Sequence, residues 1–113
     1  MAAALLNLYV EQGATFERQL TIYEAEAIPK ILTGSTLAGQ IRYNVQSSDI
    51  AAEFECIIQD QTLHPGGAII RIAAAGTQLL TQPNAYYDLE LTTGTVTQRL
   101  LEGQVFISGN VTR

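Results

Sequence analysis

The sequence predicts an all-β fold, a single antiparallel β-sandwich of immunoglobulin-like type that covers residues 1–113 and has about seven strands. Apolar and polar residues alternate along most of the chain, as in strands with one buried face. Turn-forming segments separate these runs about every ten to fifteen residues. Apolar residues make up 47% of the chain, which is enough for a folded core. A small β-barrel is the alternative.

The alternation also identifies which face of each strand packs into the core. The clearest case is the fourth strand, in which Phe54 and Cys56 face one way and Glu53 and Glu55 face the other. The predicted strands cover residues 6–10, 14–23, 35–45, 50–59, 68–73, 86–91 and 96–107.

Two connections carry helical signals. A few helical turns are conceivable through residues 23–27, but Pro29 would end them. Residues 73–81 are rich in alanine and leucine and precede Pro83, which predicts one short helical turn between strands.

The C-terminal hairpin turns at Thr93-Gly94, where glycine accepts a positive φ. Its first strand begins with Tyr86 and Tyr87, either of which could be the buried tyrosine of an immunoglobulin-like sixth strand. In its second strand the apolar phase changes parity at Leu100. We predict a β-bulge there, because one extra residue restores the core-facing phase.

The last strand is apolar on both faces, because Leu100 and Phe106 fall in the phase opposite to Leu101. Either the bulge tucks both side chains inside, or the strand borders a partner through edge pairing or a subunit contact. Under the second interpretation the interface residues are Leu100, Phe106, Tyr86, Leu6 and Leu8.

No combination of residues indicates catalysis, so we predict a non-enzymatic protein without catalytic residues, metal or cofactor. The single histidine, His64, lies in a predicted tight turn, and the single cysteine, Cys56, lies in an apolar phase that favours a buried, inert thiol. Three carboxylate pairs have the spacing of a strand face, where solvated acids are expected: Glu24/Glu26, Glu53/Glu55 and Asp88/Glu90.

Charge constrains the partners. The net charge is −5 and the six basic residues are dispersed, so neither nucleic acid nor an anionic membrane is an expected partner. Only 15% of residues are charged, and interface cores are depleted of charge, so much of the surface suits contact with other subunits. The opening residues lack the basic region of a signal peptide, which predicts use without secretion.

Four stretches resemble a recurring small virion protein of tailed bacteriophages: LYVEQGATFERQLTIY, LTGSTLAGQIR, AYYDLEL and TQRLLEGQVFISGNVTR. That family is similar to the immunoglobulin-like N-terminal module of phage baseplate upper proteins, which anchors receptor-binding machinery to the tail. The chain departs from the family pattern at Gln82-Pro83-Asn84-Ala85, before the sixth strand. The resemblance implies a virion structural role and offers no catalytic residues.

Three functional hypotheses follow. The first is a docking or adaptor module of the tail, baseplate or fibre-attachment region, made in the host cytoplasm and located in the virion, with other virion proteins and further copies of itself as partners. The second is a capsid cement or decoration protein. The third is a carbohydrate-binding β-sandwich, for which Tyr9, Tyr23, Tyr43 and Tyr86 are the candidate rings.

Overall fold

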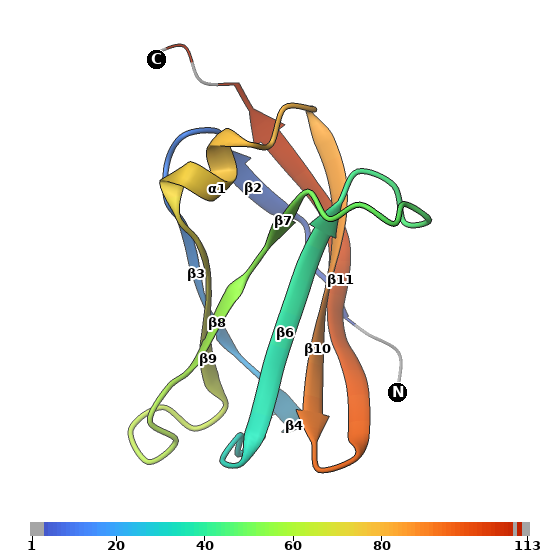
Figure 1. The fold of residues 1–113 in the computed structure, drawn as a ribbon. Helices are drawn as coiled ribbons and strands as arrows, with labels where there is room; N and C mark the ends of the chain where they lie inside the picture. The colour runs from blue at the N-terminus through green and yellow to red at the C-terminus, as the bar shows by residue number, and fades with distance from the viewer. Residues whose placement is uncertain (1–3, 110, 112–113) are drawn as a thin grey trace.

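The chain folds into two main β-sheets packed face to face (Figure 1), which confirms the predicted all-β sandwich, and a separate two-stranded hairpin. A computed structural model describes residues 4–109 and 111. The larger sheet has the order β1-β11-β10-β6-β7, with β2 also paired to β11. Its strands are β1 (Ala4–Leu5), β2 (Leu8–Glu11), β6 (Ser35–Arg42), β7 (Ala52–Glu53), β10 (Asn84–Thr93) and β11 (Val96–Ser108). The smaller sheet contains β3 (Phe16–Thr21), β9 (Gly67–Ile72) and β8 (Glu55–Ile58), in that order.

The strand order is that of an immunoglobulin-like sandwich. In that fold one sheet contains the second, fifth and fourth strands, and the other contains the third, sixth and seventh. Here β3, β9 and β8 form the first set, and β6, β10 and β11 form the second. All seven predicted strands are therefore present, with the fourth divided into β7 and β8, and the short strand β1 precedes the predicted first strand.

The N-terminal strand departs from the predicted antiparallel pairing. It runs parallel to β11, with Ala4 opposite Leu101 and Leu8 opposite Val105. Because β10 covers the other side, β11 is an interior strand of its sheet. The predicted edge pairing through the last strand is thus wrong, and β3 forms an edge of the smaller sheet instead.

The connection after β3 contains a small hairpin in place of the helical turns that were conceivable there. Its strands are β4 (Tyr23–Ala25) and β5 (Ile28–Pro29). Ala27 in the turn has a φ of 62°, which is a left-handed conformation that breaks a helix.

One strand belongs to both sheets. Its first part, β7, pairs with β6 of the larger sheet, and its second part, β8, pairs with β9 of the smaller sheet. Phe54 lies between the two parts, and its N–H donates to the carbonyl of Gly39 on β6 (3.0 Å). The Phe54 ring packs against Phe16 and Tyr87, with centroid separations of 6.2 and 5.8 Å.

The core consists of two clusters of buried side chains. The main cluster fills the space between the sheets, and β2, β9 and β10 supply alternate residues to it. A second cluster lies beside the β4–β5 hairpin and contains Ile22, Leu32, Ala68 and Leu91. The main cluster contains Leu8, Val10, Leu20, Ile41, Phe54, Ile70, Ile72, Leu80, Ala85, Tyr87, Leu89 and Val105.

The predicted helical turn is confirmed as α1 (Ala74–Gln78), which connects β9 to β10. Its buried Thr77 hydroxyl accepts a hydrogen bond from the Gly13 N–H (3.0 Å) and donates to the Ala14 carbonyl (2.8 Å). These bonds attach the helix to the turn between β2 and β3. No helix in the described part of the chain is long and apolar enough to cross a membrane.

The predicted bulge is also confirmed. Leu89 pairs with Leu101, whereas Glu90 pairs with Arg99, so Leu100 is the additional residue. Leu100 packs against the second core cluster, and Leu101 packs against the main one. The extra residue therefore lets one strand supply adjacent leucines to both clusters.

Candidate interaction surfaces

The outer face of the larger sheet carries an open groove of about 690 Å³. Directly paired residues project to the same side of a sheet, so the groove is lined by cross-strand rows. Leu5, Asn7 and Val45 also line it. Its two central rows are Arg42–Tyr86–Gln104 and Gln40–Asp88–Glu102.

Arg99 organises the charge in this groove. Asp88 and Glu102 are register partners, an arrangement in which like charges repel. The Arg99 guanidinium lies 3.4 Å from the Asp88 carboxylate and 3.7 Å from that of Glu102, which offsets the repulsion. Glu90, the register partner of Arg99, makes no ion pair with any other residue in the described part of the chain.

Tyr86 is the exposed aromatic residue of the groove. Its side chain is 42% exposed, and its hydroxyl makes no hydrogen bond within residues 4–109. Arg42 beside it is held in place, because its guanidinium donates to the Ser47 carbonyl and to the Gln40 side-chain oxygen, both at 2.9 Å. Tyr86 therefore presents a free ring and hydroxyl next to a fixed guanidinium.

A second aromatic feature lies at one end of the same sheet. Tyr9 on β2 and Phe106 on β11 are register partners whose rings stack with a centroid distance of 5.4 Å and an interplanar angle of 27°. Tyr9 is exposed and Phe106 is partly buried beneath it. The pair closes this part of the sheet face and leaves an aromatic surface toward solvent.

Five exposed apolar side chains lie on segments at the hairpin end, which is the end of the sandwich with the β4–β5 hairpin and the β10–β11 turn (Figure 1). The helix α1 lies at the opposite end. The five hairpin-end side chains are 55% to 74% exposed: Tyr23, Ile28, Ile31, Leu63 and Val96.

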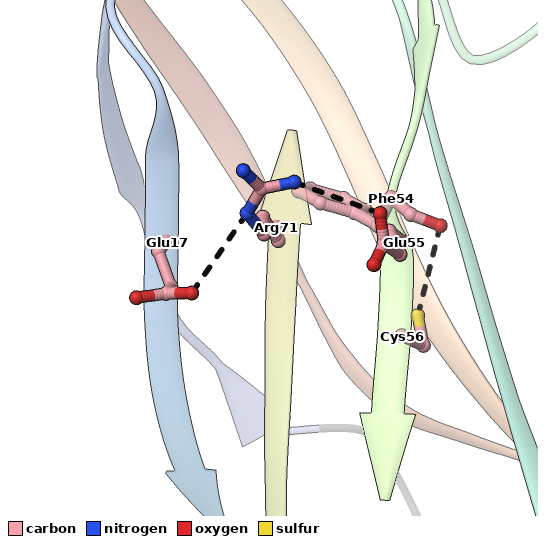
Figure 2. Close-up of polar contacts among 5 residues, drawn as sticks. All are labelled: Glu17, Phe54, Glu55, Cys56 and Arg71. Atoms are coloured by element: carbon pink, nitrogen blue, oxygen red, sulfur yellow. Dashed lines mark hydrogen bonds and ion pairs between the residues drawn. The ribbon is translucent and has the colours of Figure 1, made fainter. Parts of the chain in front are cut away.

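The outer face of the smaller sheet differs, because it carries charges that pair with each other (Figure 2). Arg71 on the central strand lies 3.9 Å from Glu17 and 3.7 Å from Glu55, its register partners on either side. Exposed pairs of this kind contribute about 0–1 kcal/mol each.

The half-buried Cys56 thiol donates to the Phe54 carbonyl (3.9 Å), and burial raises the pKa of this thiol.

The five predicted interface residues are distributed between core and surface. Tyr86 lines the groove, and Phe106 stacks under Tyr9. Leu8 is fully buried in the main core, and Leu100 is tucked against the second cluster, so neither side chain projects outward. Leu6 packs partly against the main core. The five residues therefore do not form one surface.

The residues considered for chemistry are also dispersed. His64 is exposed in its turn, and the two glutamate pairs are solvent-exposed, whereas Asp88 and Glu90 line the groove. Within the described residues, no group of three or more histidine, cysteine or acidic side chains is placed to hold a metal ion. Sequence reasoning missed the groove rows, because they depend on the register of three strands. It also missed the hairpin end, because its apolar residues are single positions in connections and at strand ends that are far apart in the sequence.

No protein family matches the chain. No curated protein matches it significantly.

Proposed function

We propose that this protein is a non-enzymatic structural protein of a tailed-bacteriophage particle, where it acts as a docking module in the tail, baseplate or fibre-attachment region. The sequence resemblance supports the virion role. The observation that carries the docking mechanism is the hairpin end, where five large apolar side chains are each more than half exposed. A standard interface needs about 800 Å² per partner and a few apolar anchors at its centre.

The Gln61 side chain joins two of the loops at the hairpin end. Its oxygen accepts hydrogen bonds from the N–H groups of Leu32 (3.0 Å) and Gly66 (2.9 Å). Its amide group donates to the carbonyls of Gln59 (2.9 Å) and Gly67 (3.1 Å). Both loops that carry Ile31 and Leu63 are therefore held together before any partner binds, which lowers the entropy cost of association.

The proposal is tested with particles produced from the genome that encodes the chain. Heads and tails are separated and analysed by mass spectrometry, and we expect the protein in the tail fraction. A chain found in the heads would favour the capsid-decoration alternative. A chain missing from both fractions would refute the virion role.

The docking mechanism is tested in a phage whose gene for this protein is deleted. The deletion is complemented with the double variant Ile31→Asp/Leu63→Asp. Placing charges at an interface centre typically costs about 2 kcal/mol or more, so we expect about a tenfold or larger loss of incorporation into particles. Leu79→Asp is the matched control, because Leu79 is 69% exposed beside α1 at the opposite end. Equal incorporation of both variants would contradict docking through the hairpin end.

A further inference from the structure

The groove on the outer face of the larger sheet has the volume of a small-ligand site. Its volume of about 690 Å³ lies within the usual range of about 300–1,000 Å³. It lies mainly on the faces of β6, β10 and β11, and none of the five hairpin-end residues lines it. The groove is therefore separate from the surface assigned above to docking.

The chemistry of the groove favours a ligand that is rich in hydroxyl groups. Sites for apolar ligands are lined mainly by apolar side chains. Here the two central rows contain one aromatic ring and five planar polar groups, which are guanidinium, amide and carboxylate. These groups supply donors and acceptors side by side, which matches hydroxyls that both donate and accept.

The charges favour a neutral ligand. Arg99 lies between the Asp88 and Glu102 carboxylates, and Arg42 is engaged by Ser47 and Gln40. Two guanidinium groups thus face three carboxylates, and no strong field of either sign remains for an ion. The acceptors of Asp88 and Glu102 that are not used by Arg99, together with Glu90, stay available for neutral donors.

Tyr86 supplies the platform that such a ligand needs. The residue is 42% exposed, its hydroxyl makes no hydrogen bond within the described residues, and its register partners Arg42 and Gln104 flank it on either side. A sugar ring combines an apolar C–H face with a polar rim. The face packs on an aromatic ring, and the rim is within reach of the flanking polar groups.

We propose that this groove binds a neutral oligosaccharide, with Tyr86 beneath a sugar ring and Arg42, Gln40, Asp88 and Gln104 bound to its hydroxyls. This site goes beyond docking, because it would give the protein a recognition function of its own. Its failure would leave the docking proposal intact, since the two use different residues and different measurements.

The test uses ¹⁵N-labelled protein titrated with chitotriose, maltotriose and cellotriose, after a neutral-glycan array has been screened for further probes. We expect at least one probe to cause saturable amide shifts that cluster on β6, β10 and β11. Tyr86→Ala should weaken that binding about tenfold, because it removes the stacking surface. Gln104→Ala should weaken it with the ring intact.

Ile57→Ala is the control, because Ile57 is exposed on β8 of the smaller sheet, outside both the groove and the hairpin end, and should leave the affinity unchanged. Amide spectra of the free variants establish that each is folded. The proposal is overturned if no neutral glycan gives saturable shifts, if the shifts lie outside the groove, or if Tyr86→Ala binds as tightly as the wild type. Groove shifts that appear only with another virion protein would assign the face to a protein interface and also overturn it.

Discussion

The Tyr87 side chain binds the N-terminal segment at the interruption between β1 and β2. Its hydroxyl donates to the Leu6 carbonyl (2.6 Å), between β1 and β2. The chain approaches closely there, because a Cβ on Gly103 would lie only 2.4 Å from the Leu6 oxygen. Asn7 lies at the same interruption of the strand. Its side-chain oxygen accepts a hydrogen bond from the Gln104 N–H (3.0 Å), in place of a backbone carbonyl. Of the two tyrosines considered for burial in this strand, Tyr87 is the buried one, and its partner lies far upstream in the sequence.

Tyr87 predicts a loss of stability in alkali. Burial raises its pKa from 10.0 to about 12, an effect that the charge of Arg18 partly opposes. Above pH 10 the unfolded chain therefore loses this proton more readily than the folded one, and the tyrosinate can no longer donate to Leu6. The contribution of Tyr87 is complete below about pH 10 and falls by about 2–3 kcal/mol as the pH rises through about 12.

Guanidinium unfolding between pH 9 and pH 12 measures this effect. The comparison is made in a Cys56→Ala background, because burial raises the pKa of the half-buried Cys56 thiol, which would also reduce stability in alkali. Tyr87→Phe should be less stable at neutral pH but should lose less stability across the alkaline range. An identical pH dependence in both proteins would contradict the assignment to Tyr87.

At the scale of elements, β3 is an edge strand that carries a charged residue opposing pairing with another chain. Arg18 is opposite the buried Ile70, which places it on the inner face of the smaller sheet, and yet it is exposed. Its side chain lines an open hollow of about 510 Å³ between β2 and β3. A charge that points inward on an edge strand opposes pairing with another chain, because the new contact would bury it.

We expect Arg18→Val to promote self-association through β3. Burying an unpaired charge costs more than about 1.4 kcal/mol, so its removal should shift association to about tenfold lower protein concentration. Size-exclusion chromatography with light scattering measures the shift. Gln19→Val is the control, because it adds a similar apolar side chain on the outer face of the same strand. A larger shift for the control than for Arg18→Val would contradict the inference that Arg18 opposes pairing through β3.

Several elements could be predicted because their signals are local. The change of apolar parity at Leu100 indicated the bulge, and Pro83 with the preceding alanines and leucines indicated the short helix. Regular alternation also identified the inward faces of β10, where Tyr87, Leu89 and Leu91 are buried. Each of these signals is contained within one strand or one connection.

Other features left no local signal. The strands of the β4–β5 hairpin are too short to show an alternating pattern of apolar residues. Its left-handed turn residue is alanine, which is not a residue that indicates a turn. The parallel pairing of β2 with β11 joins segments from opposite ends of the sequence. The alternation of Ala52, Phe54 and Cys56 continues without interruption through the change of sheet. The groove was unpredictable for the same reason, since Arg42 and Gln104 are neighbours of Tyr86 only through strand register.

At the scale of the whole molecule, Phe54 couples the two layers. It lies where one strand leaves the larger sheet for the smaller, and its ring contacts aromatic side chains from both sheets. A Cβ on Gly39 would lie 2.9 Å from the Phe54 ring, so the absence of a side chain there makes room for it. The sheets are therefore connected by covalent chain and by packing at the same position.

We expect Phe54→Ala to lower the free energy of unfolding by about 3–5 kcal/mol, the usual range for removing a buried phenylalanine. Because small domains are stable by about 5–15 kcal/mol, this is a large share of the total. Denaturant titration gives the value, and Ile57→Ala, three residues further along and 39% exposed, provides the comparison. A loss for Phe54→Ala no greater than that for Ile57→Ala would show that the layers are held together elsewhere.

The parallel pairing of the first and last strands has a mechanical consequence. Parallel neighbours enter from the same end, so a pull on the chain before Ala4 and after Ser108 acts in opposite directions along adjacent strands. Such a load shears the β1/β2–β11 hydrogen bonds together, whereas an antiparallel hairpin would unzip them one at a time. The sandwich is therefore built to resist tension along its length, with Tyr87 and Asn7 securing the strand that would have to slide first.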